Sequence, residues 1–298
     1  MASSPPSAPE AGAAEILRAS RHHEAFLRLT EQTRSLGAAR ALLAAEWRYL
    51  GPLLAGHAHP RVLDMACGTG SQSLAWAERG GQVVGIDFDH GLLDLGRSHA
   101  AEADHVARRA AAGGVPPGWV CGDARRLPFP DGAFDVVFCN SLLEHVPAWR
   151  AVLAEIGRVL EPGGVAIVYT TNRHCPLQQE VNHFPFYSWL PEAMKRPLLG
   201  WIMVHRRDLV NYTDFPAVNW FTFPGMRRAF AAVGLEPRDR IDLLAVGGRG
   251  GARGTLARLM HAQPALKLGY YFASISMAMY GIRRATDASG RPARPPVE

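Results

Sequence analysis

Hydrophobic positions in the middle of the chain alternate between short apolar runs and longer stretches with helical spacing. The apolar runs predict strands over 61–66, 82–87, 119–121, 134–140 and 165–171. The stretches between them predict helices over 71–79, 90–103 and 148–160, the second of them capped by Asp89. The run 134–140 is almost continuously apolar, as expected for a strand that helices cover on both faces. This alternation predicts a parallel sheet with right-handed crossovers.

Different patterns flank this region. Residues 13–55 carry apolar side chains at helical spacing and predict two or three helices. Residues 172–222 contain five prolines and many aromatic residues without a regular period. A long irregular stretch of this kind inside a domain is usually functional, so we interpret it as an insertion after the fifth strand.

The pattern resumes towards the end of the chain. We expect a helix over 224–233, a strand over 238–246, a glycine-rich loop over 247–251 and a helix over 254–262. The apolar segment Tyr270–Ile282 suits a strand or a helix, and we favour a strand. With it, the sheet has seven strands. Residues 1–12 and 286–298 are predicted to be flexible tails around one domain over 13–285.

Composition narrows the function classes. The 298 residues carry a formal net charge of +5 that is spread thinly along the chain. No aromatic-basic module accompanies this charge, so we expect no nucleic-acid partner. Lys195 and Lys267 are the only lysines, which makes a lysine-based mechanism improbable. The cysteines at 67, 121, 139 and 175 show no metal-binding spacing and favour a reducing, cytoplasmic setting.

The stretch Val62–Gly70 has the sequence Val-Leu-Asp-Met-Ala-Cys-Gly-Thr-Gly and is the most informative part of the chain. A buried strand passes Asp64 and ends in a turn that contains Gly68 and Gly70. Glycine is favoured where the backbone takes a positive φ or where a ligand lies against it. In an open α/β sheet, ligands bind beyond the carboxyl ends of the strands, where this turn lies.

Polar residues end four of the predicted strands: Asp64, Asp87, Asp123 and Asn140. In a parallel sheet these ends face one crevice. A carboxylate at Asp87 can accept hydrogen bonds from both hydroxyls of a ribose. Asp123 suits the exocyclic amine of adenine, and Phe88 can pack on the face of that base. The set therefore predicts a site for an adenine nucleoside.

These residues resemble the class I S-adenosylmethionine-dependent methyltransferases, specifically the type 11 group. The segments that carry the resemblance are Val62–Gly70, Val83–Asp89, Gly122–Asp135, Asn140–Val146 and Arg158–Gly164. It implies a Rossmann-like, seven-stranded, mostly parallel α/β sheet flanked by helices, with N-terminal helices and the insertion 172–222 on the substrate side. S-adenosylmethionine is the implied cofactor.

The resemblance also implies a role for each site residue. Asp64 and the backbone of Cys67, Gly68 and Gly70 would lie near the methionine part of the cofactor. Asp87 would bind the ribose, Asp123 and Ala124 the adenine, and Asn140 and Ser141 would line the crevice beside the sulfonium.

Two other interpretations compete with this one. A NAD-dependent dehydrogenase would carry a third glycine where this chain has Ser73, which disfavours that interpretation. A protein that binds the cofactor without catalysis would keep the same acidic positions, and only an assay of turnover separates it from an enzyme.

A general base is needed only if the acceptor must lose a proton. His145, His174 and His183 are the candidates, with His183 in the insertion preferred over His145, for which a structural role is favoured. Some ubiquinone-pathway methyltransferases carry Glu-x-x-Glu-His as a proposed metal site. This chain has Ser141-x-x-Glu144-His145 and lacks the first carboxylate, so we predict no metal.

The aromatic residues of the insertion suit a small apolar or aromatic methyl acceptor. A quinone, a polyketide-like natural product and a lipid head group all remain open, as do O-, N- and C-methylation, with O-methylation favoured. Pro197–Val204, followed by Arg206 and Arg207, is a candidate for peripheral contact with a membrane. The sequence leaves the oligomeric state and the pathway undetermined.

Overall fold

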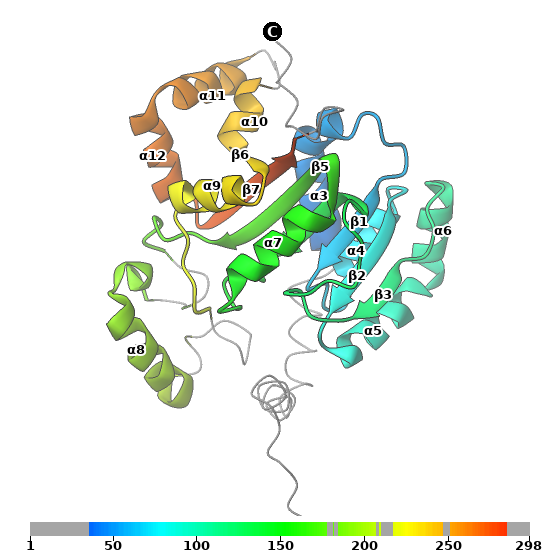
Figure 1. The fold of residues 1–298 in the computed structure, drawn as a ribbon, viewed down its shortest axis with the longest axis horizontal. Coiled ribbons are helices and arrows are strands. Elements are labelled where there is room, and N and C mark those ends of the chain that lie inside the picture. Colours follow the sequence, from blue (N-terminus) through cyan, green and yellow to red (C-terminus); the bar gives the residue numbers. More distant parts are fainter. Residues whose placement is uncertain are drawn as a thin grey trace, which may run out of the picture.

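The computed structural model describes residues 36–177, 181, 184–206, 209, 217–246 and 251–284, and a seven-stranded sheet runs through them (Figure 1). The strands are β1 Arg61–Met65, β2 Gln82–Asp87, β3 Gly118–Cys121, β4 Phe134–Asn140, β5 Leu160–Thr171, β6 Leu235–Asp239 and β7 Ser276–Arg283. Their order is β3-β2-β1-β4-β5-β7-β6, with β7 antiparallel to both neighbours and the first five strands parallel. This confirms the predicted fold class.

Helices cover both faces of the sheet. The helices of the described residues are α3 Leu36–Leu53, α4 Ser71–Ala77, α5 His90–Ala100, α6 Ala103–Ala111, α7 Trp149–Val159, α8 Glu192–His205, α9 Phe223–Ala232, α10 Arg240–Val246, α11 Ala252–Ala262 and α12 Pro264–Ala273. Of these, α8 lies apart from the sheet (Figure 1) and packs in a cluster of its own. Strand β4 shows why its sequence is almost continuously apolar. Val137 and Cys139 enter the core with α7 and α9, whereas Val136 and Phe138 enter the core with α3 and α4.

The strand register aligns the carboxyl ends of the central strands. Met65 of β1 lies opposite Ile86 of β2 and Cys139 of β4. The loops that follow these three strands therefore start at the same edge of the sheet. Helix α5 begins where the sequence predicted, because the Asp89 side chain accepts hydrogen bonds from two backbone amides of its first turn.

The predicted strand over 238–246 is wrong. Strand β6 ends at Asp239, and helix α10 begins at the next residue. The carboxylate of Asp239 accepts hydrogen bonds from the backbone N–H groups of Ile241 and Asp242 at 2.9 and 3.0 Å, which starts a helix there. A short apolar run does not distinguish strand from helix, so the pattern alone missed this change.

Three other helices were not predicted. Helix α8 lies inside the stretch 172–222, which the sequence pattern indicates to be irregular. Its sequence shows no helical period, because it contains Pro197 and Gly200 and because apolar residues occur on all its sides. Helix α6 follows α5 after a short break, and α12 takes up the start of the segment Tyr270–Ile282, whose strand begins only at Ser276. A proline at the first position, as in α12, was an available signal.

Several predictions fall outside the described residues, namely any helix before residue 36, both tails, most of the 247–251 loop and His183. All four cysteines are described and none forms a disulfide; Cys67, Cys139 and Cys175 are buried, whereas Cys121 is exposed. Within the part of the chain that the structure describes, no helix is long and apolar enough to cross a bilayer.

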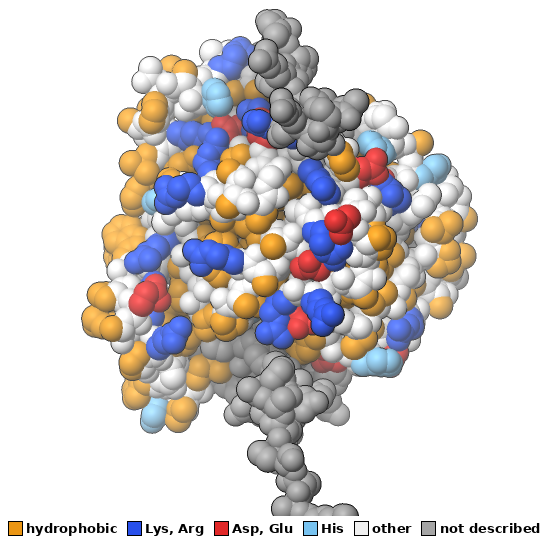
Figure 2. All heavy atoms as spheres, viewed as in Figure 1, with side chains coloured by type: hydrophobic (Ala, Val, Ile, Leu, Met, Phe, Trp, Pro, Cys, Tyr) orange, Lys and Arg blue, Asp and Glu red, His pale blue; other side chains and the backbone are white. Residues whose placement is uncertain are grey.

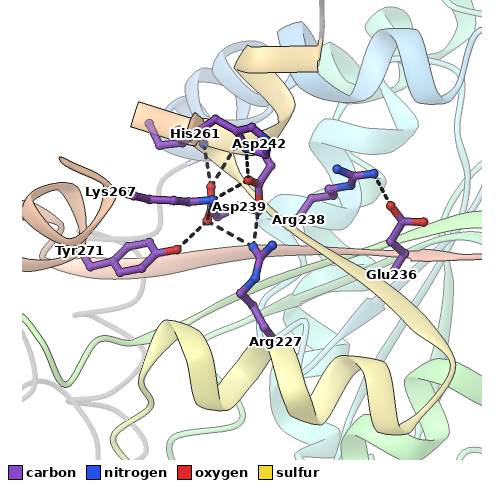
Figure 3. Close-up of polar contacts among 9 residues, drawn as sticks. Arg227, Glu236, Arg238, Asp239, Asp242, His261, Lys267 and Tyr271 are labelled. Atoms are coloured by element: carbon purple, nitrogen blue, oxygen red, sulfur yellow. Dashed lines mark hydrogen bonds and ion pairs between the residues drawn. The ribbon is translucent and has the colours of Figure 1, made fainter. Parts of the chain in front are cut away.

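Two buried carboxylates, Asp239 and Asp242, hold α9, α10, α11 and α12 together (Figure 3). Arg227 of α9 donates to Asp242 at 2.6 Å, and Lys267 of α12 lies 2.9 Å from Asp239. Tyr271 and His261 add contacts at 3.0 and 2.8 Å. Buried charges are tolerated only when they are paired in this way.

The ion pairs lower the pKa of Asp242. Burial alone would raise its pKa, but hydrogen bonds from Lys267 and Arg227 hold the pKa well below its usual range. The folded state therefore favours the ionised form relative to the unfolded chain. This stabilisation is present above the unfolded pKa of about 4 and is lost as the pH falls below it.

Replacing Asp242 with alanine should lower the free energy of unfolding by about 1.5–3 kcal/mol, because the half-buried Arg227 and Lys267 each lose a charge-assisted hydrogen bond and keep only Asp239 as a partner. The matched control is Glu236→Ala, which removes the ion pairs of Glu236 with Arg238 and Arg284 near the surface. It should lower the free energy of unfolding by less than about 1 kcal/mol. Urea denaturation measures both. The difference between wild type and the Asp242 variant should shrink below pH about 4; equal losses for the two variants would contradict the assignment.

Candidate functional site

The turn after β1 is built from left-handed backbone. Ala66, Gly68 and Gly70 have φ values of 55°, 54° and 78°. Glycine adopts this conformation without cost, but in a residue with a side chain it costs about 1–2 kcal/mol, so Ala66 is held under strain. Such strain persists where the surroundings impose it, and it is common at functional sites.

A hydrogen bond between neighbouring strand ends holds the turn. The backbone N–H of Gly68 donates to Oδ2 of Asp87 at 2.9 Å, and that of Cys67 donates to the carbonyl of Ile86 at 3.1 Å. The other oxygen of Asp87 accepts from the N–H of Asp89 at 3.0 Å. The buried Asp87 carboxylate thus connects the β1 turn to the start of α5.

Gly70 has a second role that the sequence did not indicate. A Cβ atom at this position would lie 2.2 Å from Cη2 of Trp119, far closer than atoms can approach. Gly85 of β2 and Gly96 of α5 face the same indole, where an added Cβ would lie 3.1 and 2.8 Å from the nearest ring atom. Three glycines therefore make room for one tryptophan beneath the turn.

A cavity of about 300 Å³ opens beside this turn. One wall comes from α3, and the remainder comes from the β1 turn, the first turn of α4 and the end of β4. The lining residues are Ala38, Ala39, Leu42, Asp64, Ala66, Cys67, Thr69, Ser71, Gln72 and Asn140. The volume lies at the lower end of the range for ligand pockets.

The cavity combines negative charge with an acceptor that lacks a partner. Asp64 is 2% exposed and accepts a hydrogen bond from Ser73 at 2.6 Å. The amide oxygen of Gln72 is buried and has no hydrogen-bond partner among the described residues. Burial, together with Asp64 and Asp87, raises the pKa of the Cys67 thiol far above its usual value, so the thiol stays neutral. The site suits a cationic group that donates hydrogen bonds.

Asn140 and Ser141 follow β4 at the same edge of the sheet. Ser141, like Ala66, is a non-glycine residue in the left-handed region, with a φ of 54°. Its hydroxyl donates to the side-chain oxygen of Asn140 at 3.3 Å, and its N–H donates to the carbonyl of Tyr169 at 3.1 Å. Asn140 lines the cavity, and the hydrogen bond from Ser141 holds its side chain.

The residues predicted for the adenine lie outside the cavity lining. Phe88 is 56% exposed at the end of β2. Asp123, beyond β3 and next to Ala124, forms an ion pair with Arg125 at 2.6 Å, and hydrogen bonds from Arg125 lower the pKa of Asp123. The cavity lining therefore includes Asp64, Cys67 and Asn140 but not Phe88, Asp123 or Ala124.

The segment after Ser141 is hydrogen-bonded to β5 and to the insertion. Glu144 is buried and accepts a hydrogen bond from Thr170 at 2.8 Å. The side-chain amide of Asn219 donates to the carbonyls of Leu143 and Val146, both at 2.9 Å. His145 lies inside this hydrogen-bonded segment. Among the described residues, no three potential metal ligands lie together.

His174, another candidate base, lies in an aromatic cluster after β5. Its ring stacks on Tyr271 with centroids 5.8 Å apart and on Phe223 at 6.4 Å. Burial lowers the pKa of His174, which favours a neutral imidazole. His174 does not line the cavity, so these contacts indicate packing between β5 and α12.

Sequence reasoning missed the α3 wall of the cavity and Gln72. Ala38 and Ala39 carry no chemical signal, and only the amphipathic spacing that includes Leu42 indicated a helix there. Gln72 and Asn219 are single polar residues whose roles depend on tertiary contacts. These residues can be assigned to the site only when it is known which helix lies over the crevice.

Known proteins match the region that builds this site. The family described as "Methyltransferase domain" matches residues 63–168. A demethylmenaquinone methyltransferase of Listeria monocytogenes is 34% identical over 156 residues, 45% of this chain; the match spans 62% of that relative, less than two thirds of its length. A malonyl-[acyl-carrier protein] O-methyltransferase of Serratia marcescens is 30% identical over 238 residues, 76% of this chain and 82% of the relative. A solved SAM-dependent methyltransferase of Methanosarcina mazei is 18% identical, with a TM-score of 0.48 over 78% of this chain and 95% of that one.

Gly70→Ala tests the packing beneath the turn. The variant should lose more stability than Gly163→Ala, because Gly163 has a φ of 91° but nothing within 4 Å of its position. The control carries only the left-handed cost of about 1–2 kcal/mol, whereas the test variant adds the collision with Trp119. Chemical denaturation compares them. The double variant Gly70→Ala, Trp119→Leu should recover part of the difference; if Gly70→Ala costs no more than Gly163→Ala, the packing argument fails.

Proposed function

Because the chain belongs to the class I S-adenosylmethionine-dependent methyltransferases, we propose that it transfers a methyl group from S-adenosylmethionine to a small apolar or aromatic acceptor. The observation that carries the proposal is the strained turn after β1 beside an acidic cavity at the carboxyl ends of β1 and β4. Ligands of open α/β sheets bind at this edge.

The residues of the cavity fit the methionine part of this cofactor. Its ammonium group can donate to the carboxylate of Asp64 and to the buried amide oxygen of Gln72. Its carboxylate can accept from the hydroxyls of Thr69 and Ser71, which also line the cavity. Asp64 and Asp87 together supply the negative potential that a sulfonium cation requires.

We assign the nucleoside to the neighbouring strand ends. An ionised carboxylate accepts about four hydrogen bonds, so the bonds from Gly68 and Asp89 do not prevent Asp87 from accepting ribose hydroxyls. Phe88 offers an exposed ring for the adenine face, and we assign Asp123 and Ala124 to the exocyclic amine. These three would complete the site on its open side.

The bound cofactor supplies an electrophilic methyl group, so the main task of the protein is alignment of the acceptor. Orientation alone contributes of order 7–11 kcal/mol at best. Asn140 and Ser141, held by their mutual hydrogen bond, would set the position of the sulfonium. A hydroxyl acceptor also needs a base, for which we propose His183, with His145 as the second candidate.

Several features favour an apolar or aromatic acceptor. The segment that follows Asn140 contacts an aromatic group, because Trp149 packs edge-on against Phe221 with ring centroids 5.1 Å apart. Farther into the insertion, the partly accessible Trp220 packs on the fully buried Tyr187 at 5.3 Å, so Trp220 is the ring that an acceptor could contact there. O-methylation is supported by the name of the Serratia relative, which is an O-methyltransferase.

Calorimetric titration with S-adenosylmethionine tests the cofactor assignment. Asp87→Ala should weaken binding by about tenfold to a hundredfold, because charge-assisted hydrogen bonds contribute about 1.5–3 kcal/mol each. Asp94→Ala, an exposed carboxylate on the following helix, is the control and should bind as the wild type does. Unchanged affinity in a folded Asp87 variant would exclude the ribose role.

Labelled cofactor incubated with lysate fractions separated by polarity should transfer its methyl group to a compound in an apolar fraction. With that acceptor in hand, His183→Ala should reduce turnover without changing cofactor affinity, because a general base contributes about a hundredfold or more. Full activity would remove His183 as the base, and cofactor binding without transfer in any fraction would favour a non-catalytic role.

A further inference from the structure

Helix α8 is apolar on two opposite sides. Leu199 and Ile202 are buried towards the protein. On the outer side, Met194, Trp201 and Val204 are exposed, with Val204 76% and Trp201 53% accessible. Their spacing of seven and three residues places them on one stripe of the helix. One buried side is sufficient to attach a helix, so the outer stripe needs another explanation.

Helix α12 repeats this arrangement. Its inner side carries the buried Tyr271 and the Lys267 that pairs with Asp239 and Asp242. Its outer side exposes Leu268 and Phe272, and Ile275 continues the same stripe beyond the helix. The one charged residue of this helix, Lys267, is directed inwards, while Leu268 and Phe272 are directed outwards, the reverse of the usual distribution.

Aromatic contacts link the two helices into one surface. Phe272 lies edge-on to Trp189 with ring centroids 6.1 Å apart, and Trp189 packs against Phe186 at 5.0 Å. Phe186 and Trp189 are each about half exposed. We call this surface the apolar band: Phe186, Trp189, Met194, Trp201, Val204, Leu268, Phe272 and Ile275. Figure 2 shows hydrophobic side chains gathered along the edge that α12 and α8 form in Figure 1.

Positive charge accompanies the band. Residues 184–206 and 251–275 contain one acidic residue, Glu192, whereas Lys195 and Lys267 are turned inwards in ion pairs and do not add to the surface charge. Arg196, Arg206 and Arg258 are exposed beside the apolar stripes. Such a surface is complementary to a layer that is apolar inside and anionic at its rim.

The band lies at the same edge of the sheet as the cavity. Asn172, directly after β5, donates to the carbonyls of Tyr271 and Ser274 at 2.6 Å each. The indole N–H of Trp189 donates to the carbonyl of Arg173 at 2.9 Å. The end of β5 thus anchors the middle of the band.

We propose that the apolar band binds the surface of an anionic lipid bilayer. Helices that lie in the membrane interface combine Trp, Phe and Leu on one side with Arg beside them, as this band does. Helix α8, with 14 residues, is about 21 Å long and shorter than the roughly 30 Å hydrocarbon core, so it lies on the bilayer. A soluble protein partner would not require the excess of positive charge, whereas anionic head groups attract each nearby cation.

This inference goes beyond methyl transfer and does not depend on it. Vesicle binding is measured without cofactor or acceptor, so a failure of the proposed activity leaves the result unaffected. If both hold, an acceptor dissolved in the bilayer would reach the cavity edge without crossing water.

Vesicle co-sedimentation of the full chain tests the proposal. The protein should sediment with vesicles of phosphatidylcholine and phosphatidylglycerol, sediment less with phosphatidylcholine alone, and be released in part by salt. The double variant Trp201→Glu, Val204→Glu should bind the anionic vesicles at least about tenfold more weakly, because two apolar side chains no longer enter the interface. Leu268→Glu with Phe272→Glu should do the same from the other helix.

Val115→Glu is the matched control, because Val115 is 51% exposed and lies outside the band. It should bind vesicles as the wild type does. Thermal unfolding of each variant verifies that the exposed substitutions leave the fold intact. Wild-type protein that ignores anionic vesicles, or band variants that bind as tightly as the control, would overturn the proposal. So would sedimentation analysis in which the band variants abolish self-association while no form binds vesicles.

Discussion

The parallel pairing of β1 with β2 and β4 is the constraint on which the site depends. Because Met65 lies level with Ile86 and Cys139, three loops start at one edge and must reverse direction within a few residues. The hydrogen bond from Gly68 to Asp87 joins two of these loops, and the strained residues Ala66 and Ser141 occur where they turn. The buried pairing of the strands supplies the stability that holds this strain in place.

The sequence predicted the strands that define the site because their signals are local. The almost continuous apolar run at 134–140 and the glycines after Asp64 can be recognised without knowledge of the tertiary structure. Helix α10 was missed because its start depends on the Asp239 carboxylate, whose capping bonds are invisible in a hydrophobic pattern. The sequence predicted one role of Gly70, the positive φ that the turn requires. It did not predict the close approach of Trp119, because that contact joins residues 49 positions apart. Gln72 and the α3 wall became visible only once the helices were placed.

The segment between β6 and β7 distributes its residues in an unusual way. It buries Asp239 and Asp242, pairs them with the inward-facing Lys267, and exposes leucines and a phenylalanine. The buried carboxylates fix α10, α11 and α12 to α9 with only a few buried apolar or aromatic side chains beside them, such as Ile241, Ala257 and Tyr271. The exposed leucines and phenylalanine are therefore available at the surface, while the internal pairing holds the helices in place.

The two outermost strands of the sheet have a bearing on how copies of the protein meet. Strand β3 has four residues, and β6 has five, with Pro237 between Glu236 and Arg238. A short edge, or one interrupted by proline and charge, offers a poor template for pairing with a further strand. The sheet is thus closed to growth from either side, which protects against edge-to-edge aggregation. Crowding of many copies on one surface would therefore bring together helices and loops rather than extend a common sheet.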